Sequence, residues 1–174
     1  DNNTIRKLNA DGSVENFIGN GNPWGQETGT RLSVSINRPS YLNVDDDFNV
    51  YYASDNHKIY KYDRTTDRVS ILAGGDWGFA DGTGQAARFR SPFDVEVNGD
   101  GSIIYVLDYG NRTIRKMTRN AENGYDVTSL MPRNDQNQQI ITGALETAQL
   151  GLPYEMEVDW DTNLIYVLSN MDWG

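Results

Sequence analysis

Short apolar runs separated by turn residues recur along the whole chain, and they are clearest between Val69 and Arg115. Each run either alternates apolar with polar residues or is rich in β-branched residues, and Gly, Asp, Asn or Pro fills the gaps. Four such runs in this stretch predict four short antiparallel strands. Much the same unit appears on either side of it.

Applied to the whole sequence, the pattern predicts twelve strands and almost no helix. The expected strands fall into groups of two, four, four and two. They are 4–8 and 14–18; 41–44, 50–53, 59–62 and 69–72; 95–97, 103–107, 114–117 and 127–130; 154–158 and 164–168. The fold class is therefore all-β.

Three markers repeat in the same order with nearly the same period, which indicates an internal repeat. One marker is an isoleucine followed by basic residues, at Ile5, Ile59 and Ile114, with spacings of 54 and 55 residues. Another is a proline before a strand, at Pro39, Pro92 and Pro153, with spacings of 53 and 61. The third is Tyr-x-x-Asp at a strand end, at Tyr52–Asp55 and Tyr105–Asp108, with Tyr166–Ser169 as a degenerate copy.

Repeated units of four antiparallel strands are the blades of a β-propeller. The motif series from Ala73 to Lys116 (a Gly-rich loop, Asp81-Gly82, Phe89-x-x-Pro92, and then Ile104-Tyr-Val-x-Asp) resembles the NHL-repeat propellers. On this basis we expect one propeller segment over 1–174. Its parts are a half blade at 1–19, blades at 39–72 and 92–130, and a half blade at 153–174.

Such propellers usually have six blades, and three blades' worth of strands cannot close a ring. The remaining blades come either from a longer chain, which we favour, or from head-to-tail pairing of two copies. The resemblance to the bacterial surface and secreted members of the family implies an extracellular or cell-surface location. It also implies a setting of polysaccharide uptake, as a lipoprotein.

The amino-acid composition limits the range of possible functions. The chain of 174 residues has 15 Lys and Arg against 25 Asp and Glu, a net charge of −10, and no cysteine. This balance disfavours nucleic-acid binding, and no apolar run reaches the roughly 20 residues that span a bilayer. One histidine excludes a multi-histidine metal site within the segment. No Gly-x-Ser-x-Gly elbow is present. We therefore expect no cofactor, with calcium held by axial carboxylates such as Asp94 and Glu155 as a minor alternative.

Strand direction gathers one set of loops on one face, which we call the upper face. It consists of the long loops that enter the innermost strands and the turns between second and third strands. The ligand-binding candidates on it are Asn22, Trp24, His57, Asp76, Trp77, Tyr109 and Asn111. Trp24 and Trp77 are equivalent repeat positions, and the alternative for both is packing between blades. We expect Asp81 to be a turn residue and the Arg-Lys pairs of the third strands to face solvent.

The sequence favours a non-catalytic binding module that presents aromatic rings, amides and carboxylates to a neutral glycan. Sugar C–H faces stack on aromatic rings, and an acidic surface repels anionic saccharides. Two alternatives remain: a scaffold that docks a partner protein, and a metal-assisted hydrolase or lyase whose missing blades carry the catalytic residues.

Overall fold

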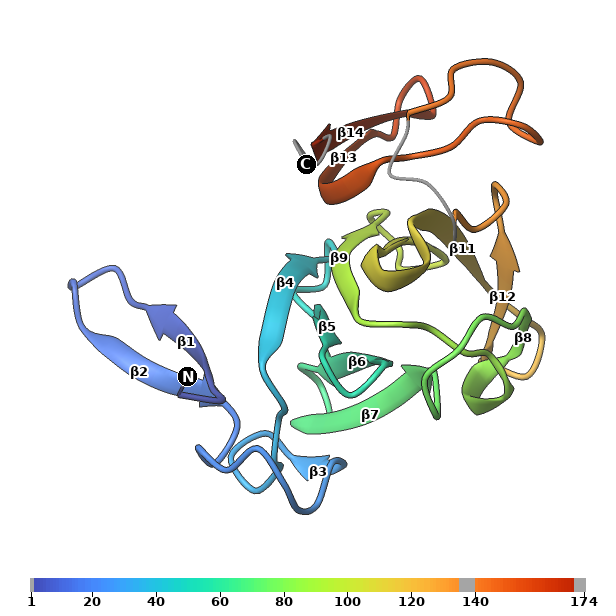
Figure 1. Cartoon of the computed structure of the whole chain (residues 1–174). Helices are drawn as coiled ribbons and strands as arrows, with labels where there is room; N and C mark the ends of the chain where they lie inside the picture. Colours follow the sequence, from blue (N-terminus) through green and yellow to red (C-terminus); the bar gives the residue numbers. More distant parts are fainter. Residues whose placement is uncertain (1, 135–139, 171–174) are drawn as a thin grey trace.

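The computed structural model describes residues 2–134 and 140–170, which form two complete and two half blades of a β-propeller (Figure 1). Strands account for 48% of the chain and helix for 4%, so the all-β prediction is confirmed. The only helical elements in the described part are two single 3₁₀ turns, η1 (Gly84–Ala86) and η2 (Tyr109–Asn111). The last four positions of the half blade expected at 153–174 lie outside the described residues.

Four antiparallel sheets follow one another along the chain. The first half blade pairs β1 (Ile5–Leu8) with β2 (Val14–Ile18). The first complete blade contains β4 (Pro39–Val44), β5 (Val50–Ser54), β6 (Lys58–Asp63) and β7 (Arg68–Ala73). The second contains β9 (Pro92–Val97), β10 (Ile103–Asp108), β11 (Thr113–Arg119) and β12 (Tyr125–Ser129). The last half blade pairs β13 (Leu152–Asp159) with β14 (Leu164–Asn170).

Each complete blade also carries a fifth strand of two residues on its outer edge. β3 (Gly29–Thr30) pairs with β7, and β8 (Gly82–Thr83) pairs with β12. Both come from the long loops that precede the innermost strands. The sequence pattern could not reveal them because two residues show no alternation. They cover part of an edge that would otherwise expose backbone groups.

The register between first and second strands repeats from blade to blade. Val95 lies opposite Val106 and Met156 opposite Val167, and in each case the register shifts next to the proline. Pro39 pairs with Ser54, whereas Pro92 pairs with Asp108. Asp108 is therefore equivalent to Ser54, and the predicted equivalence of Asp55 with Asp108 is wrong by one residue. The extra residue of the second blade is absorbed in η2.

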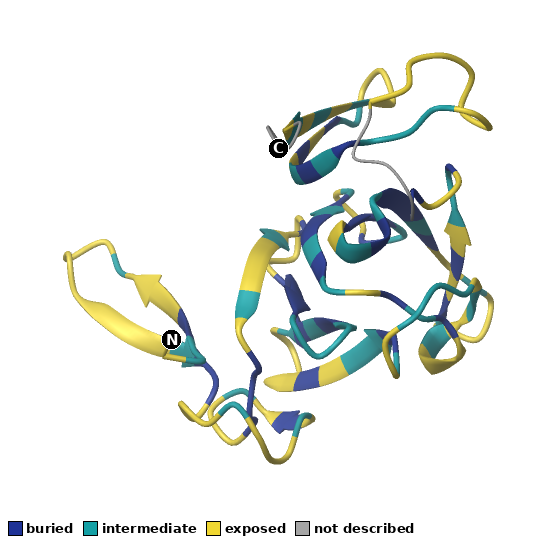
Figure 2. Cartoon of the chain, viewed as in Figure 1, coloured by how far each residue is buried: buried dark blue, intermediate teal, exposed yellow. Residues whose placement is uncertain are grey.

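The cores lie between adjacent blades (Figure 2). Innermost strands stand side by side, β9 between β4 and β13. Val95 and Val97 of β9 are accordingly buried. Their repeat equivalents Leu42 and Val44 are 46% and 42% exposed, because the preceding half blade contributes no innermost strand. No helix among the described residues is long and apolar enough to cross a membrane.

Candidate functional site

The two loop tryptophans project into solvent. Trp24 is 77% exposed and Trp77 is 65% exposed. Trp77 keeps this exposure although complete blades lie on both sides of its loop, so packing between blades does not account for its position. Large exposed aromatic rings at equivalent repeat positions are typical of a recognition surface.

Trp77 sits beside Arg90, which lies two residues before the proline of β9. The Arg90 guanidinium carbon is 5.6 Å from the centre of the Trp77 ring. The stem of Arg90 then crosses Gly110, where an added Cβ would lie 2.5 Å from Arg90 Cγ and from its carbonyl oxygen. Only glycine permits this close approach. The Gly110 N–H donates to the Arg90 carbonyl at 2.8 Å, which fixes the loop of Trp77 to the η2 turn.

Tyr109 continues the aromatic surface toward the propeller axis. Its ring is partly exposed, and its centroid lies 5.7 Å from that of Phe93, which in turn lies 5.2 Å from Tyr41. These three rings come from two adjacent blades. The upper face therefore offers a row of rings whose edges and faces reach solvent.

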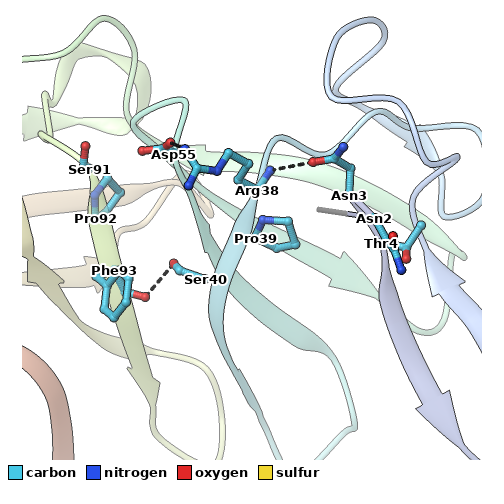
Figure 3. Close-up of a pocket in the computed structure, with 10 residues that line it drawn as sticks. All are labelled: Asn2, Asn3, Thr4, Arg38, Pro39, Ser40, Asp55, Ser91, Pro92 and Phe93. Carbon is cyan, nitrogen blue, oxygen red and sulfur yellow. Dashed lines mark hydrogen bonds and ion pairs between the residues drawn. The ribbon is translucent and has the colours of Figure 1, made fainter.

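Two depressions lie on the upper face one blade apart, and they share Ser91. One, of about 320 Å³, is lined by the first half blade and by the starts of β4 and β9 in the two complete blades (Figure 3); its lining includes Asn3, Arg38, Asp55 and Phe93. The other, of about 410 Å³, is lined by Arg90, Ser91, Tyr109, Gly110, Arg112, Asn134 and Leu152. We call the second depression the arginine pocket.

His57 accepts a hydrogen bond that joins two adjacent blades, and an equivalent hydrogen bond occurs at one other blade junction. Its Nδ1 accepts the N–H of Ser91 at 3.1 Å, and the Asn3 side chain accepts the N–H of Arg38 at 3.2 Å. Asn3 and His57 both adopt left-handed backbone conformations, with φ of 48° and 67°. Burial lowers the pKa of His57, with Arg90 and Lys58 acting in the same direction and Asp55 opposing them. His57 therefore joins blades as a neutral acceptor.

Asn111 lies beneath the upper face and is 2% exposed. Its amide nitrogen donates to the Gly78 carbonyl at 2.8 Å and to Asp108 at 2.7 Å. This geometry orients the loop that follows Trp77 rather than a ligand. It gives Asn111 a supporting position within the candidate site.

Arg115 corrects two sequence expectations. Its side chain is fully buried, between the rings of Phe79 and Phe89 at 4.9 and 5.2 Å. It donates to Asp81 at 2.7 Å and to Asp108 at 3.2 Å. The predictions of a solvent-facing arginine and of Asp81 as a simple turn residue are therefore wrong. Burial raises the pKa of Asp108 to about 6, and its hydrogen bonds and Arg115 oppose that rise.

The remaining predicted residues are peripheral. Asp76 is exposed and its carboxylate meets Arg88 at 3.1 Å. Asn22 is exposed on the loop of Trp24, where its N–H donates to the Asn20 side chain at 2.9 Å. Of the predicted set, the structure thus gathers Trp77, Tyr109, His57 and Asn111 around Arg90 and Ser91. Trp24 and Asn22 lie on the preceding long loop.

Carboxylates of the innermost strands line the other side of β9. Asp94 accepts the N–H of Met156 at 2.7 Å, and Glu96 accepts the Asn43 amide at 2.9 Å. Burial raises the pKa of Asp94, and Glu155 and Glu157 add to that rise. Burial also raises the pKa of Glu96 to about 7, with Asp94 and Glu157 adding to it and Asn43 opposing. Among the described residues, no group of three or more His, Cys, Asp or Glu side chains is arranged to hold a metal ion.

Comparison with known sequences gives no family assignment, because no family model matches the chain. The chain is 28% identical over 137 residues to Protein SUPPRESSOR OF QUENCHING 1, chloroplastic, of Arabidopsis thaliana. That match covers 73% of this chain and 13% of the plant protein. The chain therefore resembles one part of a much longer protein.

Three solved structures share the fold. The first is a protein of unknown function from Bacteroides thetaiotaomicron, with a TM-score of 0.65 and 23% identity over 89% of this chain. The second is an auxiliary nutrient binding protein of the same species, with a TM-score of 0.67 and 17% identity over 95% of this chain. The third is an auxiliary nutrient binding protein from Bacteroides ovatus, with a TM-score of 0.54 and 16% identity over 93% of this chain. The chain spans 37%, 40% and 55% of these proteins respectively.

Sequence reasoning missed Arg90, Arg112 and Phe93 as parts of the candidate site. Arg90 and Phe93 flank the Ser91-Pro92 strand start, and the same topological argument that selected Trp77 places this start on the upper face. The close approach of Arg90 to Gly110 left no signal in the sequence, because it depends on the positions of two separate loops.

Proposed function

We propose that this chain is part of a binding protein whose upper face holds a glycan, in a bacterial extracellular or cell-surface setting. The observation that carries the proposal is the exposure of Trp24 and Trp77 at equivalent positions, with Trp77 fixed beside Arg90. Sugar rings stack on such aromatic faces, while hydroxyl groups require fixed hydrogen-bonding partners. The fold neighbours named auxiliary nutrient binding proteins support a binding role.

The test is calorimetric titration guided by a glycan array, using Trp24→Ala and Trp77→Ala. Each substitution should weaken glycan binding about three- to tenfold, because each removes one stacking platform. Phe48→Ala is the matched control, since Phe48 is also 64% exposed but lies in the β4–β5 turn on the opposite face. The proposal fails if no glycan binds, or if both tryptophan variants bind as the unaltered chain does.

A further inference from the structure

The charges of this acidic chain are divided between its two faces. The turns opposite the upper face, which form the lower face, are β1–β2, β4–β5, β6–β7, β9–β10, β11–β12 and β13–β14. Their described residues carry the carboxylates Asp11, Asp45, Asp46, Asp47, Asp67, Asp100, Glu122 and Asp161, and the single basic residue Arg64. On the upper face, the described loop residues carry Arg38, Arg88, Arg90, Arg112 and Arg133 against Glu27, Asp55, Asp76, Asp81 and Glu146. Arg31, although part of the first long loop, lies beside the lower face, where it pairs with Asp67 of the β6–β7 turn at 2.9 Å.

This separation removes the reason for expecting only neutral ligands. Charges on the lower face are about a strand length away from the upper face, which exceeds the screening length of roughly 8 Å at physiological salt. The local charge of the upper face therefore determines which ligands can bind there. A net charge of −10 does not exclude an anion from the upper face.

The arginine pocket contains two arginines and no carboxylate among its described lining residues. Neither Arg90 nor Arg112 forms an ion pair with any described residue, whereas Arg38, Arg88 and Arg115 each contact a carboxylate. Arg90 is held in place over Gly110 and beside Trp77. Two cations that line one pocket without a counter-charge favour an anionic group from outside the described chain.

Arg112 departs from the structural role of its repeat position. It has the left-handed conformation of Asn3 and His57, with a φ of 54°. Asn3 and His57 use that position to accept the N–H of the residue before the next proline. A guanidinium group has only donors and cannot accept the corresponding N–H of Leu152. The Arg112 side chain is thus available to the pocket it lines.

We propose that the arginine pocket binds a carboxylate carried by a sugar ring, so that the upper face recognises a saccharide containing uronic acid. This inference rests on the proposed glycan-binding function and specifies its substrate class. The planar guanidinium fork matches a carboxylate. The rings of Trp77 and Tyr109 border the same arginines and suit the apolar face of a sugar. The hydroxyl of Ser91, which also lines the pocket, supplies a hydrogen-bonding group for a sugar hydroxyl.

The experiment is calorimetric titration with oligosaccharides of galacturonic, glucuronic and mannuronic acid, each paired with its carboxyl-reduced neutral counterpart. At least one acidic oligosaccharide should bind about tenfold or more tightly than its neutral counterpart. Arg90→Gln and Arg112→Asn should remove most of that difference. Asparagine suits the left-handed backbone at position 112, as Asn3 does at its own position. Arg68→Gln on the outer strand β7 is the control, which removes one positive charge away from the pocket.

The outcomes separate the two proposals. Equal binding of acidic and neutral forms, unaffected by both arginine substitutions, overturns the carboxylate site and leaves the glycan-binding function intact. Absence of binding by every saccharide overturns both. A poly-glutamate peptide and a single-stranded oligonucleotide serve as further probes. If either binds as tightly as the best saccharide, with the same dependence on Arg90 and Arg112, the assignment to a sugar is wrong.

Discussion

His57 shows how a single side chain couples two blades of this propeller to pH. Its Nδ1 accepts the Ser91 N–H, and the doubly protonated ring can no longer accept. The charged and titratable groups facing it are Asp55, Lys58 and Arg90, and burial is the main cause of its lowered pKa. Only the neutral ring maintains the contact.

We predict that the contribution of His57 to the free energy of unfolding decreases as pH falls below about 6.5, the pKa of histidine in the unfolded chain. In that range the unfolded chain takes up a proton before the folded chain does, and the loss ends below the lowered pKa. His57→Asn should preserve stability at pH 8 to within about 1 kcal/mol, because Asn3 makes the same contact. Urea unfolding between pH 8 and 5 tests this. Identical pH slopes for both proteins would contradict it.

Arg115 marks the limit of sequence reasoning at the residue scale. The Ile-Arg-Lys repeat motif indicated a strand, and β11 confirms it. The motif could not show that Arg115 is buried while Lys116 is not. That difference depends on Asp81 and Asp108, which are brought to Arg115 from other parts of the blade. Tyr60 occupies the equivalent position in the preceding blade, so comparison of the repeats does not indicate a buried arginine.

At the scale of elements, the sequence predicted the long strands well because alternation and turn residues determine them locally. It did not predict β3 and β8, whose pairing depends on where two long loops return. The candidate site shows the same contrast between features set by the local sequence and features set by where separate loops meet. Topology placed Trp77 and Tyr109 on one face, but the fit of Arg90 against Gly110 requires coordinates.

The innermost strands contain a second titrating group, whose effect on stability changes with pH in the opposite direction to that of His57. Glu96 lies in β9, where burial raises its pKa to about 7. At this site the folded chain therefore binds more protons than the unfolded chain between about pH 4.5 and 7, and the contribution of Glu96 to stability falls as pH rises through this range. Glu96→Gln keeps an acceptor for the Asn43 amide and should remove this loss. We expect a gain of about 1 kcal/mol at pH 8, allowing for solvent screening. Calorimetric melting at pH 5 and 8 tests it, and an unchanged or lower melting temperature at pH 8 would refute it.

At the scale of the whole molecule, β14 and β1 each have an unpaired edge that their counterparts in the complete blades pair with a neighbouring strand. β14 pairs only with β13, and β1 pairs only with β2. On one side of β14, the apolar residues Leu164, Tyr166 and Leu168 are 52%, 59% and 52% exposed. β14 is equivalent to the second strands β5 and β10, and β1 to the third strands β6 and β11. Exposed, unpaired strands of this kind favour association.

The repeat register predicts how these edges fit. Tyr51 lies opposite Lys61, whose ammonium is 5.4 Å from the ring centre, and Tyr105 lies opposite Lys116. The same register places Tyr166 opposite Lys7 and Leu168 opposite Ile5. The two edges of one sequence are therefore complementary at both apolar and charged positions.

We accordingly predict that the 174-residue chain, produced by itself, associates head to tail through β14 and β1. Light scattering during gel filtration should show the mass rising with concentration from 19.6 kDa toward twice that value. Tyr166→Lys should weaken association because it places two lysines opposite each other. Adding Lys7→Glu should restore it by creating an opposite-charge pair. A mass that stays at 19.6 kDa at the highest concentrations would show that the edges do not recognise each other. Failure of the second substitution to restore association would show that the register is not that of β10 and β11.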